Sequence, residues 1–258
     1  MVFIDSHCHL DFAVLQSDIE QVIARAQMNQ VGAFVVPSVS AANFNSVIEL
    51  ARSNRNIYFA LGLHPCFIEQ HDIPDLVTLE QLLDCEDSCA VGEIGLDFLI
   101  SNDTQNRAQQ QRIFEAQIAL ATQYQLPVIL HVRKAHDQVL QVLKKANFAY
   151  GGVVHAFNGS VVQAKRYTQE FGFKLGFGGT LTHPKALKIR ALASSLPLTD
   201  IVLETDAPDM PLFNMKREYN EPANILDIAK VLSELRCESL DEIRDQILRN
   251  TKDCLNIT

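Results

Sequence analysis

The sequence lacks any apolar run of the roughly 18 uninterrupted residues that a membrane-spanning helix needs. It also lacks a basic N-terminal segment followed by an apolar core, which would mark a secretory signal. Both absences predict a soluble, cytoplasmic protein that does not associate with membranes. The chain has 258 residues, 47% of them hydrophobic, and one α/β barrel fits this length, so we expect a single domain over residues 1–258.

Cysteine is present without a pattern, because no two of the six cysteines form a CxxC pair. A domain of this size does not need disulfides for stability. We therefore predict reduced thiols that mostly serve as packing residues. The positions are Cys8, Cys66, Cys85, Cys89, Cys237 and Cys254.

Positive charge is scarce, since 22 Lys and Arg face 31 Asp and Glu and the formal net charge is −9. Proteins that hold long duplexes through many phosphate contacts usually present a broad basic surface. The charge therefore disfavours a duplex, and a phosphate-bearing substrate would be attracted locally by metals and a few basic side chains. Single-stranded DNA ends are such a substrate. No sequence feature calls for an obligate protein partner.

Short apolar runs alternate with longer amphipathic segments along the whole chain. Predicted strands are residues 3–7, 33–37, 58–63, 90–96, 128–131, 152–155, 174–177 and 201–205. Predicted helices are residues 18–29, 43–52, 79–83, 107–124, 137–145, 161–169, 185–193, 225–235 and 240–255. Eight β-then-α repeats predict a parallel sheet closed into a (β/α)8 TIM barrel. An open doubly wound sheet is the weaker alternative, because no Gly-rich dinucleotide fingerprint follows the first strand. The segment 207–221 after the last strand is interpreted as a long active-site loop.

Two histidines separated by one residue stand at the end of the first apolar run. On a strand, residues i and i+2 point to the same face, so His7 and His9 can converge while Cys8 faces away. Neutral imidazole is a good ligand for zinc and other transition metals. The pair alone fits a hydrogen-bonding role in the core or a loop equally well. Its interpretation therefore depends on ligands elsewhere in the chain.

Further polar residues end other predicted strands whose bodies are apolar. In a barrel the carboxyl ends of the strands meet at one mouth, where catalytic groups gather. Each residue alone is compatible with a structural role, such as a helix cap or a satisfied histidine. Together, six donors exceed what one ion needs and predict a two-metal centre that Glu93 can bridge. The six are His7, His9, Glu93, His131, His155 and Asp206.

A centre with two metals predicts hydrolysis. A metal-bound water loses a proton to a carboxylate in reach, and the metals stabilise charge on the substrate oxygen under attack. The identity of the two divalent ions stays open, because histidine suits Zn whereas carboxylates also admit Mn or Mg.

Five segments resemble, in order and spacing, the motifs of the TatD-like metal-dependent hydrolases, which belong to the amidohydrolase-like barrels. They are His7-Cys8-His9, Gly92-Glu93-Ile94-Gly95-Leu96-Asp97, His131-Val132-Arg133, His155-Ala156-Phe157-Asn158-Gly159 and Glu204-Thr205-Asp206-Ala207-Pro208. The resemblance spans essentially the whole chain. It implies a (β/α)8 fold, two divalent-metal sites and hydrolase activity that in the family is typically directed at phosphodiester bonds in DNA.

The resemblance also implies which residues hold which ion. One ion would be bound by His7, His9, Glu93 and Asp206, and the other by Glu93, His131 and His155. Asn158 stands where the family commonly has serine. It lies outside the implied ligand set, so the difference bears on substrate contacts rather than on the metals.

Three features suggest how a phosphate would be held. Arg133 lies two residues beyond His131, so on an extended segment its guanidinium points to the same mouth and matches paired phosphate oxygens, although it could also be a solvated or ion-paired residue. His64 follows the third predicted strand, and we assign it to substrate binding or proton transfer. The glycine-rich segment 176–180 stands where many barrels bind phosphate on backbone N–H groups, or it serves only a tight turn.

The favoured function is a divalent-metal-dependent phosphodiesterase of the deoxyribonuclease type, acting on a DNA 3′ end or a small phosphoester through a metal-bound hydroxide. Asp206 is the expected general base, and Glu93 is the second catalytic residue. The alternative is an amidohydrolase-type enzyme that cleaves C–N or ester bonds, since related barrels use similar metals to polarise a carbonyl. Those enzymes often carry a lysine at the place of Glu93. A non-enzymatic metal-binding protein is the third hypothesis.

Overall fold

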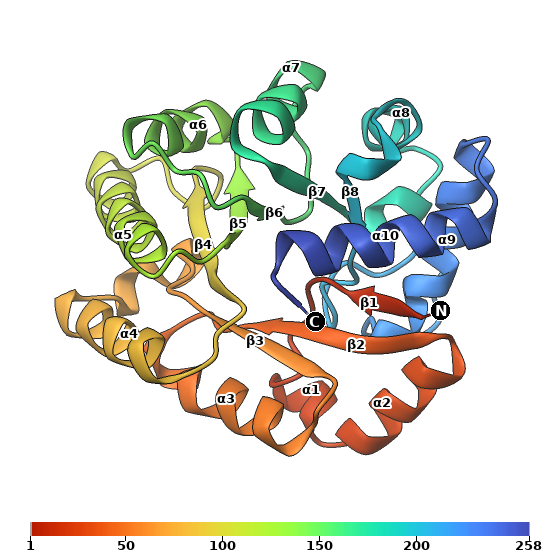
Figure 1. Ribbon diagram of the computed structural model, residues 1–258, viewed down its shortest axis with the longest axis horizontal. Coiled ribbons are helices and arrows are strands. Elements are labelled where there is room, and N and C mark those ends of the chain that lie inside the picture. Colours follow the sequence, from red (N-terminus) through yellow and green to blue (C-terminus); the bar gives the residue numbers. More distant parts are fainter. Residues whose placement is uncertain (1, 258) are drawn as a thin grey trace.

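The computed structural model describes residues 2–257, and its strands form one parallel sheet. Each strand pairs with the next along the chain, from β1 to β8. The strands are β1 (Phe3–Asp5), β2 (Val31–Pro37), β3 (Ile57–Leu61), β4 (Ala90–Asp97), β5 (Val128–Arg133), β6 (Gly152–Val154), β7 (Phe173–Phe177) and β8 (Ile201–Leu203). Figure 1 shows the helices arranged as a ring around them. The predicted (β/α)8 barrel is confirmed.

Hydrogen bonds between the segments that follow β1 and β8 close the barrel. The Ser6 amide donates to the Leu203 carbonyl at 3.1 Å, and the Asp206 amide donates to the His7 carbonyl at 2.9 Å. The His9 amide continues this ladder into the loop after β8. The first and last strands therefore lie side by side, which brings residues from opposite ends of the chain to one mouth of the barrel.

The helices agree with the sequence prediction in number and order, apart from three differences. They are α1 (Ala13–Gln16), α2 (Ile19–Met28), α3 (Phe44–Ser53), α4 (Ile73–Cys85), α5 (Thr104–Gln123), α6 (His136–Lys145), α7 (Val161–Lys165), α8 (Leu187–Ser195), α9 (Ile225–Leu235) and α10 (Leu240–Cys254). The short α1 is not predicted, and α7 passes into a π-helical turn at Arg166–Glu170. The predicted helix 79–83 is too short, because α4 starts at a capping box between Asp72 and Asp75 and tolerates proline in its first turn.

Four predicted strands are too long at their carboxyl ends, because β1, β3, β6 and β8 stop earlier than expected. Three of them, β1, β6 and β8, stop before the histidines and acids. His7, His9, His155 and Asp206 therefore lie in loop segments directly beyond the strands rather than on them. The residues 207–221 form neither helix nor strand, in agreement with the predicted loop. Polar side chains at these strand ends are consequently free to turn toward one another.

Two apolar layers support the barrel. The larger cluster fills the space between the sheet and the surrounding helices. A smaller cluster lies inside the barrel, where Ile4, Val35 and Val202 from separate strands meet Leu255 and Ile257 from the end of the chain. Figure 1 shows the segment that follows α10 beside the strands. Because this apolar cluster fills the amino end of the barrel, the polar groups gather at the carboxyl end.

All six cysteines are free thiols. Cys8 is buried, and its thiol lies 3.8 Å from the Val35 carbonyl oxygen. The prediction that the cysteines mostly pack is wrong for Cys66, Cys85 and Cys237, which are exposed. Within residues 2–257, none of the helices is both long enough and apolar enough to cross a membrane.

Candidate metal centre

His7 and His9, which follow β1, face Asp206, which follows β8. The Nε2 atoms of both histidines lie 3.6 Å from the same carboxylate oxygen of Asp206. Asp5 supports this arrangement, because its buried carboxylate accepts hydrogen bonds from the amides of His7 and Thr205 and from the Thr205 hydroxyl. The two loop segments are thereby held in place, and the three side chains converge.

Glu93 on β4 lies between two groups of histidines. Its Oε2 atom is 3.1 Å from His7 Nε2 and 3.7 Å from His9 Nε2. Its Oε1 atom is 2.9 Å from His131 Nδ1 and 3.2 Å from His64 Nε2. A carboxylate whose two oxygens face different ligand groups has the geometry to bridge two metal ions.

His155 follows β6 and completes the cluster. Its ring stacks on that of His7 with centroids 3.8 Å apart, and its Nε2 atom lies 3.5 Å from Asp206 Oδ2. Its Nδ1 atom faces Glu204 Oε1 at 3.0 Å. The same Glu204 oxygen accepts a hydrogen bond from the Ala156 amide at 2.6 Å. Buried Glu204 therefore fixes the orientation of the imidazole, as carboxylates behind metal-ligating histidines commonly do.

Asp97, the last residue of β4, has the same relation to His131. Its Oδ2 atom lies 3.0 Å from His131 Nε2, and its other oxygen accepts hydrogen bonds from the amides of Leu99 and Ile100. Neither Asp97 nor Glu204 is assigned a role from the sequence alone. The available signal is that both acids end strands within the recognised motifs.

The residues present fit divalent metal ions. Among residues 2–257, both ring nitrogens of His7 and Nδ1 of His9 are buried without a hydrogen-bond partner. A buried polar atom left unpaired costs about 1–3 kcal/mol, which coordination to an ion would remove. Three groups of donors each have their atoms within 4.8 Å of one another: His7, His9 and Asp206; His7, Glu93 and His155; and His64, Cys66 and His131. The second group differs from the ligand set that the family resemblance implies, because it contains His7 where His131 is expected. His131 instead groups with His64 and Cys66, and it also contacts Glu93.

Charges within the cluster shift one another's proton affinities. Burial raises the pKa of Glu93, but the neighbouring imidazoles, chiefly that of His64, hold this pKa well below its ordinary value. Burial opposes protonation of His155, yet the carboxylates of Glu204 and Asp206 raise its pKa well above the ordinary value. Against the effect of burial, His155 lowers the pKa of Asp206 to about 2. Protonated imidazoles thus neutralise the charge of the carboxylates in the metal-free cluster. Bound metal cations can take the place of the protons on these imidazoles.

His64 and Arg133 lie on the same side of the cluster. His64 is buried; its Nδ1 atom accepts a hydrogen bond from the Cys66 amide, so its Nε2 atom is directed at Glu93. The guanidinium of Arg133 lies 3.6 Å from Asp97, and its side chain is 47% exposed. Arg133 is therefore free to bind a ligand, whereas His64 contacts the centre through Glu93.

The glycines of the segment 176–180 have a packing role, and Gly176 lies within β7, not in a loop after that strand as the sequence suggests. A Cβ atom on Gly176 would lie 2.2 Å from Glu204 Oε2, and one on Gly179 would lie 2.0 Å from the Met210 carbonyl oxygen. Glycine is required at both positions because no side chain fits. Gly176 thus leaves the space in which Glu204 reaches His155.

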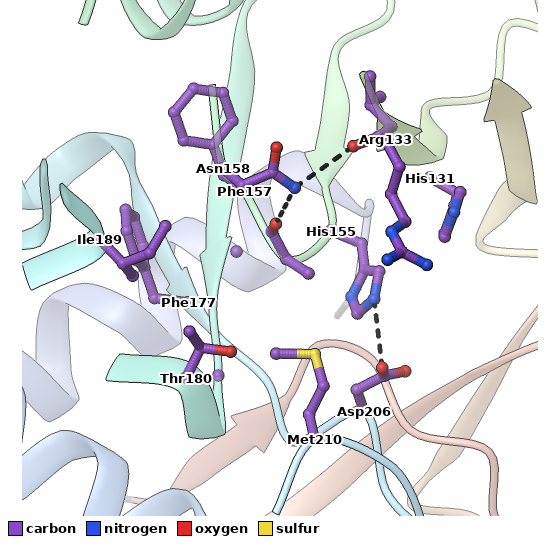
Figure 2. Close-up of a pocket in the computed structure, with 14 residues that line it drawn as sticks. His131, Arg133, His155, Phe157, Asn158, Phe177, Thr180, Ile189, Asp206 and Met210 are labelled. Atoms are coloured by element: carbon purple, nitrogen blue, oxygen red, sulfur yellow. Dashed lines mark hydrogen bonds and ion pairs between the residues drawn. The ribbon is translucent and has the colours of Figure 1, made fainter. Parts of the chain in front are cut away.

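A cavity of about 390 Å³ opens beside the cluster (Figure 2). His131, His155, Asp206 and Arg133 contribute to its lining. Asn158 also lines it, and its amide nitrogen donates to the carbonyl oxygens of two neighbouring backbone residues at 3.2 and 3.4 Å. The cavity gives a ligand direct access to the carboxylate of Asp206.

The family model described as TatD related DNase matches residues 4–256. The chain is similar to the uncharacterized metal-dependent hydrolase YjjV of Escherichia coli (strain K12), with 44% identity over 257 residues that cover 99% of this chain and 98% of the relative. An uncharacterized metal-dependent hydrolase of Haemophilus influenzae is 39% identical over 251 residues, which cover 95% of each chain.

Solved structures support the same assignment. The crystal structure of YjjV, a TatD homologue from Escherichia coli, superposes with a TM-score of 0.95 at 43% identity, covering 99% of this chain and 98% of that one. A phosphotriesterase homology protein from Escherichia coli, crystallised with phosphate in its active site, has a TM-score of 0.65 at 12% identity, covering 98% and 97%. The latter likeness concerns the fold alone.

Proposed function

The chain belongs to the family of TatD-related DNases and is a metal-dependent hydrolase, and from this premise we propose that it cleaves phosphodiester bonds. The observation that carries the proposal is the position of Glu93, with one oxygen toward His7 and the other toward His131. This geometry suits two ions spaced to act on one phosphoryl group.

We propose that two divalent ions, Zn, Mn or Mg, occupy the centre. His7, His9 and Asp206 would hold one of them, His131 and His155 would hold the other, and Glu93 would bridge both. When bound, such ions activate water and withdraw charge from the phosphoryl oxygens. The mixed imidazole and carboxylate donors accept all three metals.

Asp206 is the proposed general base. Its side chain lines the cavity and is 16% exposed, so a water molecule can reach it. Its low pKa keeps the carboxylate ionised at neutral pH and able to accept a proton. In the metal-free protein the carboxylates of Glu204 and Asp206 raise the pKa of His155 against the effect of burial. The His155 imidazole lies 3.5 Å from Asp206, and a bound ion would take the place of that proton as the positive partner of Asp206.

Arg133 is the proposed phosphate ligand. It lines the cavity with Asp206, and its guanidinium has a single ion pair at 3.6 Å among residues 2–257. A guanidinium can bind two phosphoryl oxygens at once, which lysine cannot do in the same geometry. His64 would support the reaction by holding Glu93.

The proposed substrates are single-stranded DNA ends or small phosphoesters. The net charge of −9 opposes extended contact with a duplex. The free thiols agree with a proposed location in the reducing cytoplasm.

The test is a hydrolysis assay on protein stripped of metal and reloaded with Zn, Mn or Mg. Substrates are bis(p-nitrophenyl) phosphate, end-labelled single-stranded and duplex DNA, and an aryl ester and anilide as carbonyl substrates. We expect metal-dependent cleavage of the phosphodiester and of the single strand, which Asp206→Asn abolishes. Cleavage of the carbonyl substrates alone, in every metal form, would refute the proposal and support the amidohydrolase alternative.

A further inference from the structure

The cavity beside the metal centre has a polar and an apolar side. Figure 2 shows Arg133 and His131 on one side and Phe177 and Ile189 on the other. Met210 lies between these two sides at the bottom of this view, beside Asp206. The proposed hydrolysis uses the polar side of the cavity only, so the apolar side is available for a second role.

Four different parts of the fold supply the apolar side. Phe157 comes from the loop after β6, Phe177 from β7, Ile189 from α8 and Met210 from the loop after β8. Phe157 and Phe177 are each only 1% exposed and form the base of the wall, whereas Ile189 and Met210 are partly exposed. A ligand in the cavity would therefore contact mainly the last two side chains.

The apolar wall is held in place by backbone hydrogen bonds. The Phe157 amide donates to the Gly176 carbonyl at 2.9 Å, which ties the loop after β6 to β7. The Met210 carbonyl accepts a hydrogen bond from the buried Asn220 side chain at 3.0 Å and also packs against Gly179. Such a wall needs little rearrangement to bind a ligand, which is typical of small-molecule sites.

The size of the cavity limits what can occupy it. Its volume of about 390 Å³ is near the lower end of the roughly 300–1,000 Å³ of ligand pockets. One ring system with its attached phosphate fits such a space, and a base-paired duplex does not. An apolar surface that faces a phosphate-binding side favours a ligand with a flat apolar ring at one end and a phosphate at the other.

We propose that Ile189 and Met210, supported by Phe157 and Phe177, form a subsite for the nucleobase of the terminal nucleotide. The proposal rests on the proposed function, since the phosphate of that nucleotide lies between Arg133 and the metal centre. It explains how an acidic protein retains a nucleic-acid end, because apolar contact with one base replaces the missing basic surface.

Binding of small phosphates to the metal-loaded protein tests the subsite without requiring catalysis. The ligands are thymidine 5′-monophosphate, phenyl phosphate, deoxyribose 5-phosphate and inorganic phosphate, measured by calorimetry. We expect both ring-bearing ligands to bind at least about tenfold more tightly than deoxyribose 5-phosphate. A tenfold difference equals about 1.4 kcal/mol, which corresponds to burial of roughly 55 Å² of apolar surface at about 25 cal/mol per Å².

The double variant Ile189→Ala with Met210→Ala should reduce this preference to about twofold or less and leave the binding of inorganic phosphate unchanged. The matched control is Leu187→Ala, two residues earlier at the start of the same helix, because Leu187 is 74% exposed and is not part of the cavity lining. A second variant, Ile189→Trp, should fill the cavity and exclude the ring-bearing ligands, whereas Leu187→Trp should have no effect. Circular dichroism confirms that each variant is folded.

The possible results separate the subsite from the reaction. Equal affinity for thymidine 5′-monophosphate and deoxyribose 5-phosphate in the unmodified protein would overturn the subsite, even if the enzyme cleaves phosphodiesters. A preference for phenyl phosphate without one for the nucleotide would overturn the assignment to a nucleobase. If the double variant and the control Leu187→Ala lost the preference for ring-bearing ligands equally, the subsite would also be overturned. If the preference follows Ile189 and Met210 but no phosphodiester is cleaved, the subsite stands and the proposed reaction fails.

Discussion

Replacing Glu204 with glutamine should weaken metal binding without changing the shape of the site. Glu204 is completely buried and contacts His155 Nδ1 at 3.0 Å and the Ala156 amide at 2.6 Å. A glutamine oxygen can keep both contacts, so the substitution removes mainly the negative charge. The altered quantity is therefore the basicity of the His155 imidazole toward a metal ion.

The size of the effect follows from the loss of charge in the Glu204–His155 ion pair. Within the part of the chain that the structure describes, His155 Nδ1 makes no hydrogen bond and is held by this 3.0 Å contact alone. Since glutamine retains the contact itself, we expect a change of about 1–1.5 kcal/mol in the free energy of metal binding. This corresponds to a roughly tenfold loss of affinity, at the lower end of the 10–100-fold range for partners behind metal ligands. The pKa of His155, which Glu204 raises against the effect of burial, should also fall.

Competition between the protein and a chromogenic chelator measures the affinity, in parallel for the unmodified protein, Glu204→Gln and the surface control Glu170→Gln. Glu170 pairs with Arg166 on the exposed side of the chain and should be silent. Because His155 loses its proton more easily in the variant, fewer protons should be released on metal binding at neutral pH. An affinity for metal within twofold of the unmodified protein, with unchanged proton release, would refute the positioning role.

Further predictions concern catalysis, substrate binding and stability. Asp206→Asn should lower kcat at least about 100-fold in the reloaded protein, as loss of a general base does, and normal KM and circular dichroism would show that the fold is intact. Arg133→Ala should raise KM for bis(p-nitrophenyl) phosphate about tenfold, and Arg133→Lys should restore it incompletely because the paired donors are lost; an unchanged KM would exclude this residue as a phosphate ligand. Removal of metal by a chelator should lower the melting temperature, and returning Zn or Mn should restore it in proportion to ln(1 + [L]/Kd), since the ligands bind ions only when folded; a melting temperature independent of metal would contradict the fit of the donors. Asp97 has its pKa lowered to about 2, against burial, by His131 and the backbone amide of Leu99. Its stabilising contribution should be complete above about pH 4 and disappear as pH falls toward 2, so Asp97→Asn should flatten urea-unfolding stability over that range; identical acid profiles would contradict it.

The barrel and the gathering of the candidate metal ligands at one mouth could be predicted because both follow from regular repeats. Parallel strands bring their carboxyl ends to one mouth, so His7, Glu93 and Asp206 had to approach one another once the β/α alternation was recognised. Where each strand stops could not be predicted. The regular part of β1 ends at Asp5, whose own carboxylate binds the His7 amide, and this local contact is absent from the apolar pattern.

The acids that contact the candidate ligands, and the apolar wall of the cavity, could not be predicted from the sequence for a different reason. An acid such as Glu204 directly after a strand is equally suited to cap a helix. Its contact with His155 joins the end of β8 to the end of β6, which are far apart in the sequence. Ile189 belongs to α8 and Met210 to the loop after β8, and nothing in the sequence links the two positions. Their shared cavity depends on three-dimensional packing that no local spacing encodes.

The closure of the barrel also affects when the metal centre can form during synthesis. Ser6, beside His7, is joined to Leu203, a partner 197 residues later in the chain. On a ribosome His7 and His9 emerge long before Asp206, and they cannot meet it until β8 has been synthesised. Completion of the proposed coordination set is consequently a late event, and a nascent chain halted before β8 holds His7 and His9 without the Asp206 carboxylate that both face in the folded protein.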